Sequence, residues 1–153
     1  MPPATPEVCR QHLTFMKWAD ERMGEAVARN MPASLETLQH IYLAELVWLD
    51  RIFGNEEALI THYEAPGNIA DLLAAFREIH AKWLGWLEAA EDLDVLIPHR
   101  NLQGEAFRMP VWQIVLHVVN HGSYHRGQVA AMLRAAGYAP PDSDLIIWYR
   151  QQG

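Results

Sequence analysis

The sequence has little of what several protein classes require. Its 153 residues include one cysteine, Cys9, so the chain can form neither an internal disulfide nor a cysteine-based zinc cage. The chain has 12 Lys and Arg residues and 19 Asp and Glu residues. The resulting formal charge of −7 argues against nucleic acid or an anionic membrane as the main partner. Residues 1–10 lack the features of a signal peptide, and no apolar stretch is long enough to cross a bilayer. We therefore expect a cytoplasmic protein.

Apolar residues make up 50% of the chain, and their spacing predicts long helices. That fraction, at this length, indicates one domain, residues 1–153, with a substantial core. In four segments the apolar residues recur at intervals of three and four, and Pro, Gly or Asn stand at the segment ends. The expected helices cover 6–29, 35–53, 68–91 and 110–136, followed by one short capping helix within 140–150.

Local signals at the helix ends support these boundaries. Ser34 is a candidate N-cap for the second helix, and Gly54 and Gly137 suit the left-handed residues that end the second and fourth. Between Asp92 and Met109 the helical period disappears, which fits a short hairpin or an ordered loop. The sequence therefore predicts an all-α fold: a four-helix bundle with that hairpin or loop between helices 3 and 4 and a short C-terminal helix.

Histidine is the residue type from which we expect chemistry, because the chain has eight of them. His121 and His125 lie on the apolar face of the fourth helix, where a polar side chain needs a partner. Two histidines four residues apart have Cβ atoms about 6 Å apart, so both rings can converge on one metal ion. A third ligand would come from a facing helix. Helical periodicity leaves three candidates: His12, His40 and His80.

Residues beside the histidines exclude two kinds of metalloenzyme. A zincin needs Glu directly after the first His of the pair, whereas Gly122 follows His121. A di-iron carboxylate bundle needs Glu three residues before a His, and no histidine of this sequence has one. Cys9 is most simply a small apolar residue. A metal-free helical interaction protein, with core histidines bonded to polar neighbours, is the alternative to a metal site.

The segment 116–128, LHVVNHGSYHRGQ, is similar to the fourth-helix signature of the DinB-like (DinB/YfiT) superfamily of four-helix-bundle metalloproteins. Segments 17–22, 39–41 and 144–150 agree with the family in order and spacing, so the resemblance spans nearly the whole chain. Asp20 stands where many relatives look to have Asn, a departure that concerns the packing of the bundle more than a metal. Despite the family's name, the resemblance implies no DNA chemistry.

The resemblance implies a divalent metal, commonly zinc or nickel, held by one histidine of the second helix and two of the fourth. Carried over to matching positions, the ligands are His40, His121 and His125, and His117 becomes a neighbour of the site. Members with known activity are S-transferases or isomerases that use a low-molecular-weight thiol, and many others have no known reaction. The resemblance also implies a homodimer.

These expectations suggest a mechanism with a small thiol and a small electrophilic substrate as partners. Three neutral imidazoles leave an open coordination position where a metal would convert a thiol into a nucleophilic thiolate. No independent catalytic nucleophile is evident in the sequence. The alternative is a non-catalytic metal-binding stress protein. The side chains expected to orient or adjoin the ligands are Glu45, Gln128 and His117, with Arg22 or Arg126 as the alternative partner of Glu45.

One face of the fourth helix motivates the expected dimer. Trp112, Leu116 and Val119 lie opposite His121 and need cover, either from the tail around Trp148 or from a second subunit. The loop from Leu96 to Phe107 is the other segment that we expect beside the site, since it carries His99 and Arg100 for an acidic cosubstrate.

Overall fold

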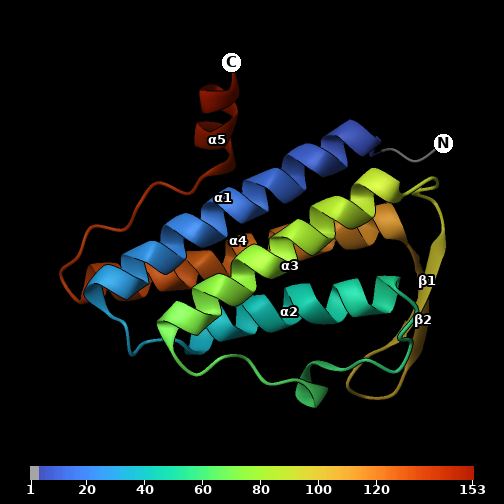
Figure 1. Ribbon diagram of the computed structural model, residues 1–153, viewed down its shortest axis with the longest axis horizontal. Helices are drawn as coiled ribbons and strands as arrows, with labels where there is room; N and C mark the ends of the chain where they lie inside the picture. The colour runs from blue at the N-terminus through green and yellow to red at the C-terminus, as the bar shows by residue number, and fades with distance from the viewer. Residues whose placement is uncertain (1–3) are drawn as a thin grey trace.

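Four long helices and a two-stranded hairpin make up most of the fold (Figure 1), which a computed structural model describes for residues 4–153. The long helices lie roughly along one direction, and a short C-terminal helix stands apart from them beside α1. The long helices are α1 (Pro6–Asn30), α2 (Glu36–Ile52), α3 (Ile69–Ala89) and α4 (Val111–Ala135). The shorter elements are η1 (Ile60–His62), β1 (Leu96–Arg100), β2 (Ala106–Pro110) and α5 (Leu145–Gln152).

The core forms where the apolar stripes of the four long helices meet. Helix α1 packs against α3 and α4, and α2 packs against α4 and α3, which is the arrangement of a bundle. Burying these stripes provides most of the helical stability, because packing of an amphipathic face contributes more to helices in proteins than intrinsic propensity does. The largest fully buried apolar side chains include Leu13, Met16, Leu38, Phe76, Trp83 and Leu133. The predicted helical bundle is confirmed.

Side-chain caps begin two of the helices. The Thr5 hydroxyl accepts a hydrogen bond from the Val8 amide at the start of α1, and the Asn68 side chain accepts one from the Asp71 amide at the start of α3. Each cap satisfies an amide that has no partner within its helix. Asn68 lies at the expected start of the third helix, and Thr5 directly precedes Pro6, the expected start of the first.

The predicted cap of the second helix is wrong. Helix α2 begins at Glu36 with Leu35 as its N-cap residue, and no side chain caps it. The Ser34 amide donates to the Met31 carbonyl in a turn that precedes the helix. Leu35 is buried in the core. Packing of this residue, and not a side-chain hydrogen bond, therefore fixes the start of the helix.

Glycine ends helices α2 and α4 as expected. Gly54 has φ +107° and Gly137 has φ +91°, values that favour glycine because it has no Cβ. The Gly54 amide donates to the carbonyl of Arg51, and the Gly137 amide donates to that of Arg134. These bonds satisfy carbonyls in the last turn of each helix, and the chain then turns away toward the next element.

The segment between α3 and α4 contains a true antiparallel hairpin, so the description all-α was too narrow. Strands β1 and β2 pair with Pro98 opposite Arg108, and Gly104 in the turn has φ +81°. The Asn101 side chain accepts hydrogen bonds from two amides of the turn. Pro110 ends β2 and is the N-cap of α4, not a residue of its first turn. The hairpin contacts α2 and α4 and lies at one end of the bundle (Figure 1).

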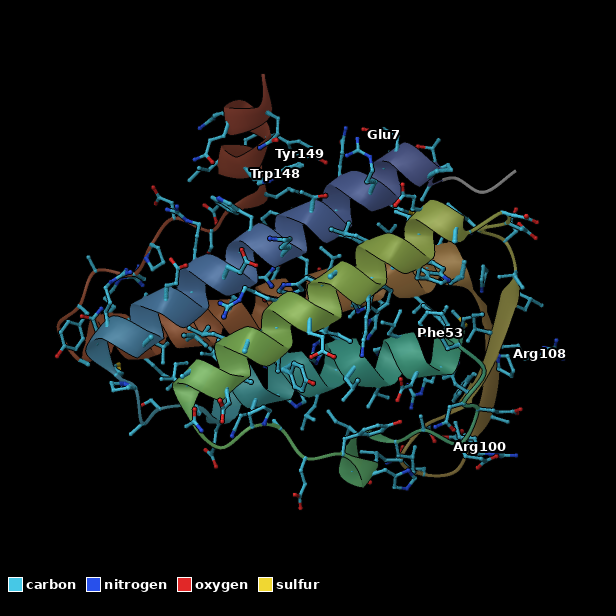
Figure 2. The ribbon with its side chains drawn as sticks, viewed as in Figure 1. Glu7, Phe53, Arg100, Arg108, Trp148 and Tyr149 are labelled. Carbon is cyan, nitrogen blue, oxygen red and sulfur yellow. The ribbon has the colours of Figure 1, made fainter. Side chains whose placement is uncertain are left out.

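The C-terminal helix covers part of α1. Trp148 is buried, with its ring centroid 6.4 Å from that of Phe15, and Figure 2 shows it beside α1. Val119 is buried within the chain, whereas Trp112 and Leu116 are partly buried against the core. These three residues therefore do not by themselves require a second subunit, and the dimer stays a prediction. Among residues 4–153, no helix combines the length and apolarity that a membrane crossing requires.

Candidate metal centre

The structure brings three imidazoles from two helices together. His40 lies near the start of α2, and His121 and His125 lie one turn apart on α4. Nε2 of His40 is 3.1 Å from Nε2 of His121, and the ring centroid of His40 is 4.5 Å from that of His125. All three rings are half-buried, and each offers a nitrogen within 4.8 Å of the other two. His40 is also the histidine of the second helix that the family resemblance implies at this site.

The spacing of these nitrogens suits one small cation. Two imidazole nitrogens bound to the same tetrahedral zinc at about 2.0–2.1 Å lie about 3.3 Å apart, close to the distance between His40 and His121. Without a proton or a cation between them, the lone pairs of these two nitrogens repel each other. The donor set therefore fits a divalent ion that accepts imidazole, such as zinc or nickel.

Burial and mutual repulsion favour neutral rings at this site. Burial lowers the pKa of His40, and the nearby His125 lowers it further. Burial and the neighbouring histidines, first of all His125, lower the pKa of His121 to about 4. Neutral imidazole is the form that binds metals. Near neutral pH, His40 and His121 therefore have free lone pairs, and protons compete weakly for them.

Gln128 orients one of the three rings. Its side-chain oxygen lies 2.7 Å from Nδ1 of His125, three residues away on the same helix. In the neutral ring, Nδ1–H donates a hydrogen bond to this oxygen, and Nε2 is then the nitrogen that can serve as a ligand. Gln128 therefore contacts His125, one of the three candidate ligands.

The remaining histidines lie outside this group. The His117 ring is a neighbour of the site, 5.9 Å from the His121 ring and 5.3 Å from that of Trp48. Nδ1 of His12 lies 2.8 Å from the Val8 carbonyl on its own helix, and His62 is an exposed residue of η1. Of the three candidates that periodicity left open, only His40 reaches the pair on α4.

Glu45 belongs to a different cluster from the one expected. Its carboxylate is buried, and Oε1 lies 3.0 Å from Nε2 of His80 on α3. The same His80 nitrogen lies 2.9 Å from Oδ2 of Asp20, whose Oδ1 accepts a hydrogen bond from Arg126 over 2.6 Å. Arg126 thus pairs with Asp20, while Arg22 donates to the Asp142 carbonyl. The alternative that paired Glu45 with an arginine was therefore also wrong.

The second cluster takes one charged or titratable residue from each long helix. Burial opposes ionisation of Asp20, but the Arg126 guanidinium outweighs it and holds the pKa of that carboxyl well below its usual value. Burial, with the charge of Asp20, raises the pKa of Glu45. Burial alone would lower the pKa of His80, yet the carboxylates of Glu45 and Asp20 raise it to about 11. One proton held between His80 and Glu45 would make these four residues electrically neutral, and the nearby Glu21, whose Oε1 lies 3.9 Å from Nδ1 of His80, is paired with Lys17.

This neutrality separates the second cluster from the three histidines. Ligand atoms of Asp20, Glu45 and His80 also lie within 4.8 Å of one another. However, the Arg126 guanidinium already supplies the positive charge beside Asp20, and a divalent ion would bring two more into a buried site. We interpret this cluster as an interhelical contact. The signal that could have found it is a set of charged residues inside apolar arcs, most clearly Asp20 between Met16 and Met23.

Gly122 makes room for this contact. A Cβ placed on Gly122 would lie 2.6 Å from Nη1 of Arg126, one turn further along α4. The missing side chain lets the guanidinium lie close to the helix on its way to Asp20. The same glycine distinguishes the His121 motif from that of a zincin, so at this position the residue serves packing.

Two adjoining cavities open beside the histidines. The larger, of about 520 Å³, lies between α2, α4 and the hairpin, and the smaller, of about 280 Å³, includes His121 in its lining. Trp48, Arg51 and His117 line both cavities. The two cavities therefore adjoin, and the smaller one reaches one of the three imidazoles, that of His121.

The chain is similar to known proteins over nearly its whole length. The model of the DinB family matches residues 8–152. Over 125 residues the chain is 31% identical to Protein DinB of Bacillus subtilis (strain 168), covering 76% of this chain and 72% of that protein. Its fold is similar to the crystal structure of a DinB-like protein from Bacillus cereus ATCC 10987, with a TM-score of 0.64 and 20% identity, covering 89% of this chain and 95% of that one.

Proposed function

The chain belongs to the DinB family, and on this premise we propose that it binds one divalent metal ion through His40, His121 and His125 and uses it for a thiol S-transfer or isomerisation. The observation that carries the proposal is the convergence of three imidazoles from two helices, with nitrogens 3.1 Å apart in the closest pair. Zinc and nickel both suit this donor set.

Each residue of the proposed centre has a distinct task. His40 belongs to α2 and the other two histidines to α4, so residues of both helices would hold the ion. His121 and His125 provide a pair on one helix face, and Gln128 fixes the ring of His125 through Nδ1. Three imidazole ligands leave one position for water or a thiol, which is typical of catalytic more than of structural zinc sites.

A bound divalent ion supplies Lewis acidity, which lowers the pKa of a thiol enough to give a thiolate near neutral pH. In S-transfer the thiol sulfur forms a bond to an electrophilic carbon, the leaving group departs with its electron pair, and the thiol proton passes to water or to the leaving group. The residues around the cavities position this second substrate and limit access of water to it.

The second candidate is a metal-binding stress protein without catalysis. In this function the ion only stabilises the contact between α2 and α4. The adjoining cavities favour the transferase, because a purely structural site needs no space for a substrate beside it.

Elemental analysis of protein purified without a His tag tests the metal part of the proposal. We expect about one equivalent of divalent metal per chain, and less than about a tenth would contradict both candidates. A screen of small thiols against electrophilic acceptors then separates them. Turnover that disappears in His121→Ala, with the helical content retained, supports the transferase, and a metal-loaded protein without turnover supports the stress protein.

A further inference from the structure

The larger cavity has walls of aromatic rings. It lies between α2, α4 and the hairpin, and its volume of about 520 Å³ falls within the usual range for small-molecule sites, about 300–1,000 Å³. Figure 2 shows Arg100 and Arg108 of the hairpin, together with Phe53 at the end of α2, at this end of the molecule. Six side chains give the wall its character: Trp48, His99, Phe107, Met109, Ile114 and His117.

The rings are held in place by one another. Trp48 meets His99 edge to face at 4.9 Å between centroids and meets His117 in the same way at 5.3 Å. Phe107 stacks on His99, with centroids 5.8 Å apart and ring planes 24° from parallel. Contacts of this kind fix ring orientations, so the wall exists before a ligand arrives.

Arg51, which also lines the cavity, holds Trp48 in place. Its guanidinium lies 4.5 Å from the centroid of the Trp48 ring, and its nitrogens donate to the carbonyls of Ala58 and Arg100. The side chain is almost fully buried, so both its charge and its position are fixed. Arg51 thereby joins α2 to the hairpin strand β1 and holds the Trp48 face beside the cavity.

The open side of the cavity is apolar and exposed. Phe107 is 41% exposed and Met109 is 37% exposed, although both line the cavity. Alternate residues of a strand point to the same face, so these two side chains of β2 lie on one surface. A ligand that covers them gains hydrophobic free energy of about 25 cal/mol for each Å² of apolar surface removed from water.

From these observations we propose that the hairpin cavity binds an aromatic ring, and that the ring belongs to the electrophilic substrate. Aromatic walls bind a flat ring better than a saturated one, through stacking and edge-to-face contacts. The role as substrate rests on the proposed function, since it depends on the smaller cavity that links Trp48 and His117 to His121. Binding of the ring itself needs no metal.

The test uses 2-naphthol and its saturated counterpart, decahydro-2-naphthol, with metal-free protein. Protein carrying ¹³C-methyl methionine gives one signal for each of six methionines, and Met109→Leu identifies the signal of Met109. We expect 2-naphthol to shift the Met109 signal saturably, while the buried Met16 and Met23 are unaffected. The saturated compound should bind about tenfold more weakly, because it lacks the ring contacts.

Two phenylalanine variants localise the binding. Phe107→Ala should weaken binding of 2-naphthol by about fivefold or more, whereas Phe53→Ala, an exposed aromatic that does not line the cavity, should change it less than about twofold. No saturable shift of Met109, equal affinity for the two compounds, or equal effects of the two variants would each overturn the proposal.

Repeating the titration with zinc present separates this proposal from the metal proposal. A protein that binds 2-naphthol but no metal contradicts the proposed function and leaves the aromatic cavity in place. A protein that binds metal but shows no preference for 2-naphthol contradicts only the aromatic cavity. If both bind, 2-naphthol should still shift Met109 in the zinc-loaded protein.

Discussion

Arg126 of α4 donates a hydrogen bond from Nη1 to Oδ1 of Asp20 on α1 over 2.6 Å, and both side chains are buried. Arg126 directly follows His125 in the sequence, so its ion pair anchors the segment of α4 that carries the candidate ligands. His80 and Glu45 extend the contact to α3 and α2. The orientation of the helices that carry the candidate metal ligands therefore depends on a buried network outside that site.

Asp20→Asn should strongly destabilise the protein. Without its carboxylate the Arg126 charge is buried unpaired, and loss of one partner of such a pair costs about 3–5 kcal/mol. Urea denaturation measures the effect. The double variant Asp20→Leu with Arg126→Met should recover most of the lost free energy of unfolding, because no unpaired charge remains. A loss below about 1 kcal/mol in Asp20→Asn would show that the pair contributes little.

Two glycines of α4 should respond in opposite directions to alanine. Gly122→Ala forces the Arg126 guanidinium away from its position, since an added Cβ would lie 2.6 Å from Nη1, and we expect a loss of about 1–3 kcal/mol. Gly127 faces open space, so Gly127→Ala should stabilise the helix by up to about 1 kcal/mol. Thermal unfolding of both variants compares them directly. Equal shifts of Tm would contradict the packing role of Gly122.

Stability should fall as the pH rises above neutrality. Because the pKa of His80 is raised to about 11 in the fold, its contribution is fully present below the unfolded value of 6.5 and is lost as the pH approaches 11. The raised pKa of Glu45 acts in the same direction. Urea midpoints at about pH 6 and about pH 9 should therefore differ more in the wild type than in His80→Gln.

The exposed His62 provides the control for this measurement. His62→Gln should keep the pH dependence of the wild type, because His62 lies outside the buried cluster. If His80→Gln shows the same decrease in urea midpoint with pH as the wild type and His62→Gln, the proton shared between His80 and Glu45 does not contribute to folding.

Gln128 should affect metal affinity without being a ligand. Gln128→Leu removes the oxygen that accepts from Nδ1 of His125, and loss of such an orienting contact lowers metal affinity by about 10- to 100-fold. Gln128→Glu retains an acceptor at the same position and should keep most of the affinity. Calorimetric titration with zinc compares the two variants. If both variants bind zinc as tightly as the wild type does, the His125 ring needs no orienting partner.

Much of the fold follows from the sequence because it depends on apolar periodicity and on glycine. The stripes predicted the four long helices, and Gly54 and Gly137 predicted where two of them end. The start of α2 was misplaced because Ser34 has the right side chain for a cap, whereas the helix begins at Glu36 with the buried Leu35 as its N-cap residue. The strands of the hairpin have too few residues for an alternating pattern to separate them from an ordered loop.

The candidate site was only partly predictable, because apolar periodicity does not show which helix faces meet. The spacing of His121 and His125 indicates a shared helix face, and the choice of His40 needed the family resemblance, since periodicity cannot say which face of one helix meets another. The interhelical cluster was missed because Asp20 and His80 are 60 residues apart in the sequence. Long-range pairings of this kind depend on how the helices pack, which apolar stripes alone do not specify.

Zinc titration of metal-free protein at neutral pH tests the central claim most directly. We expect one tight site per chain, and His40→Ala and His121→Ala should each weaken it by about 100-fold or more, because removal of one ligand leaves a two-histidine site. His62→Ala, outside the site, should bind like the wild type. The absence of a tight site in the wild type, or tight binding that survives in His40→Ala, would contradict a metal centre shared by α2 and α4.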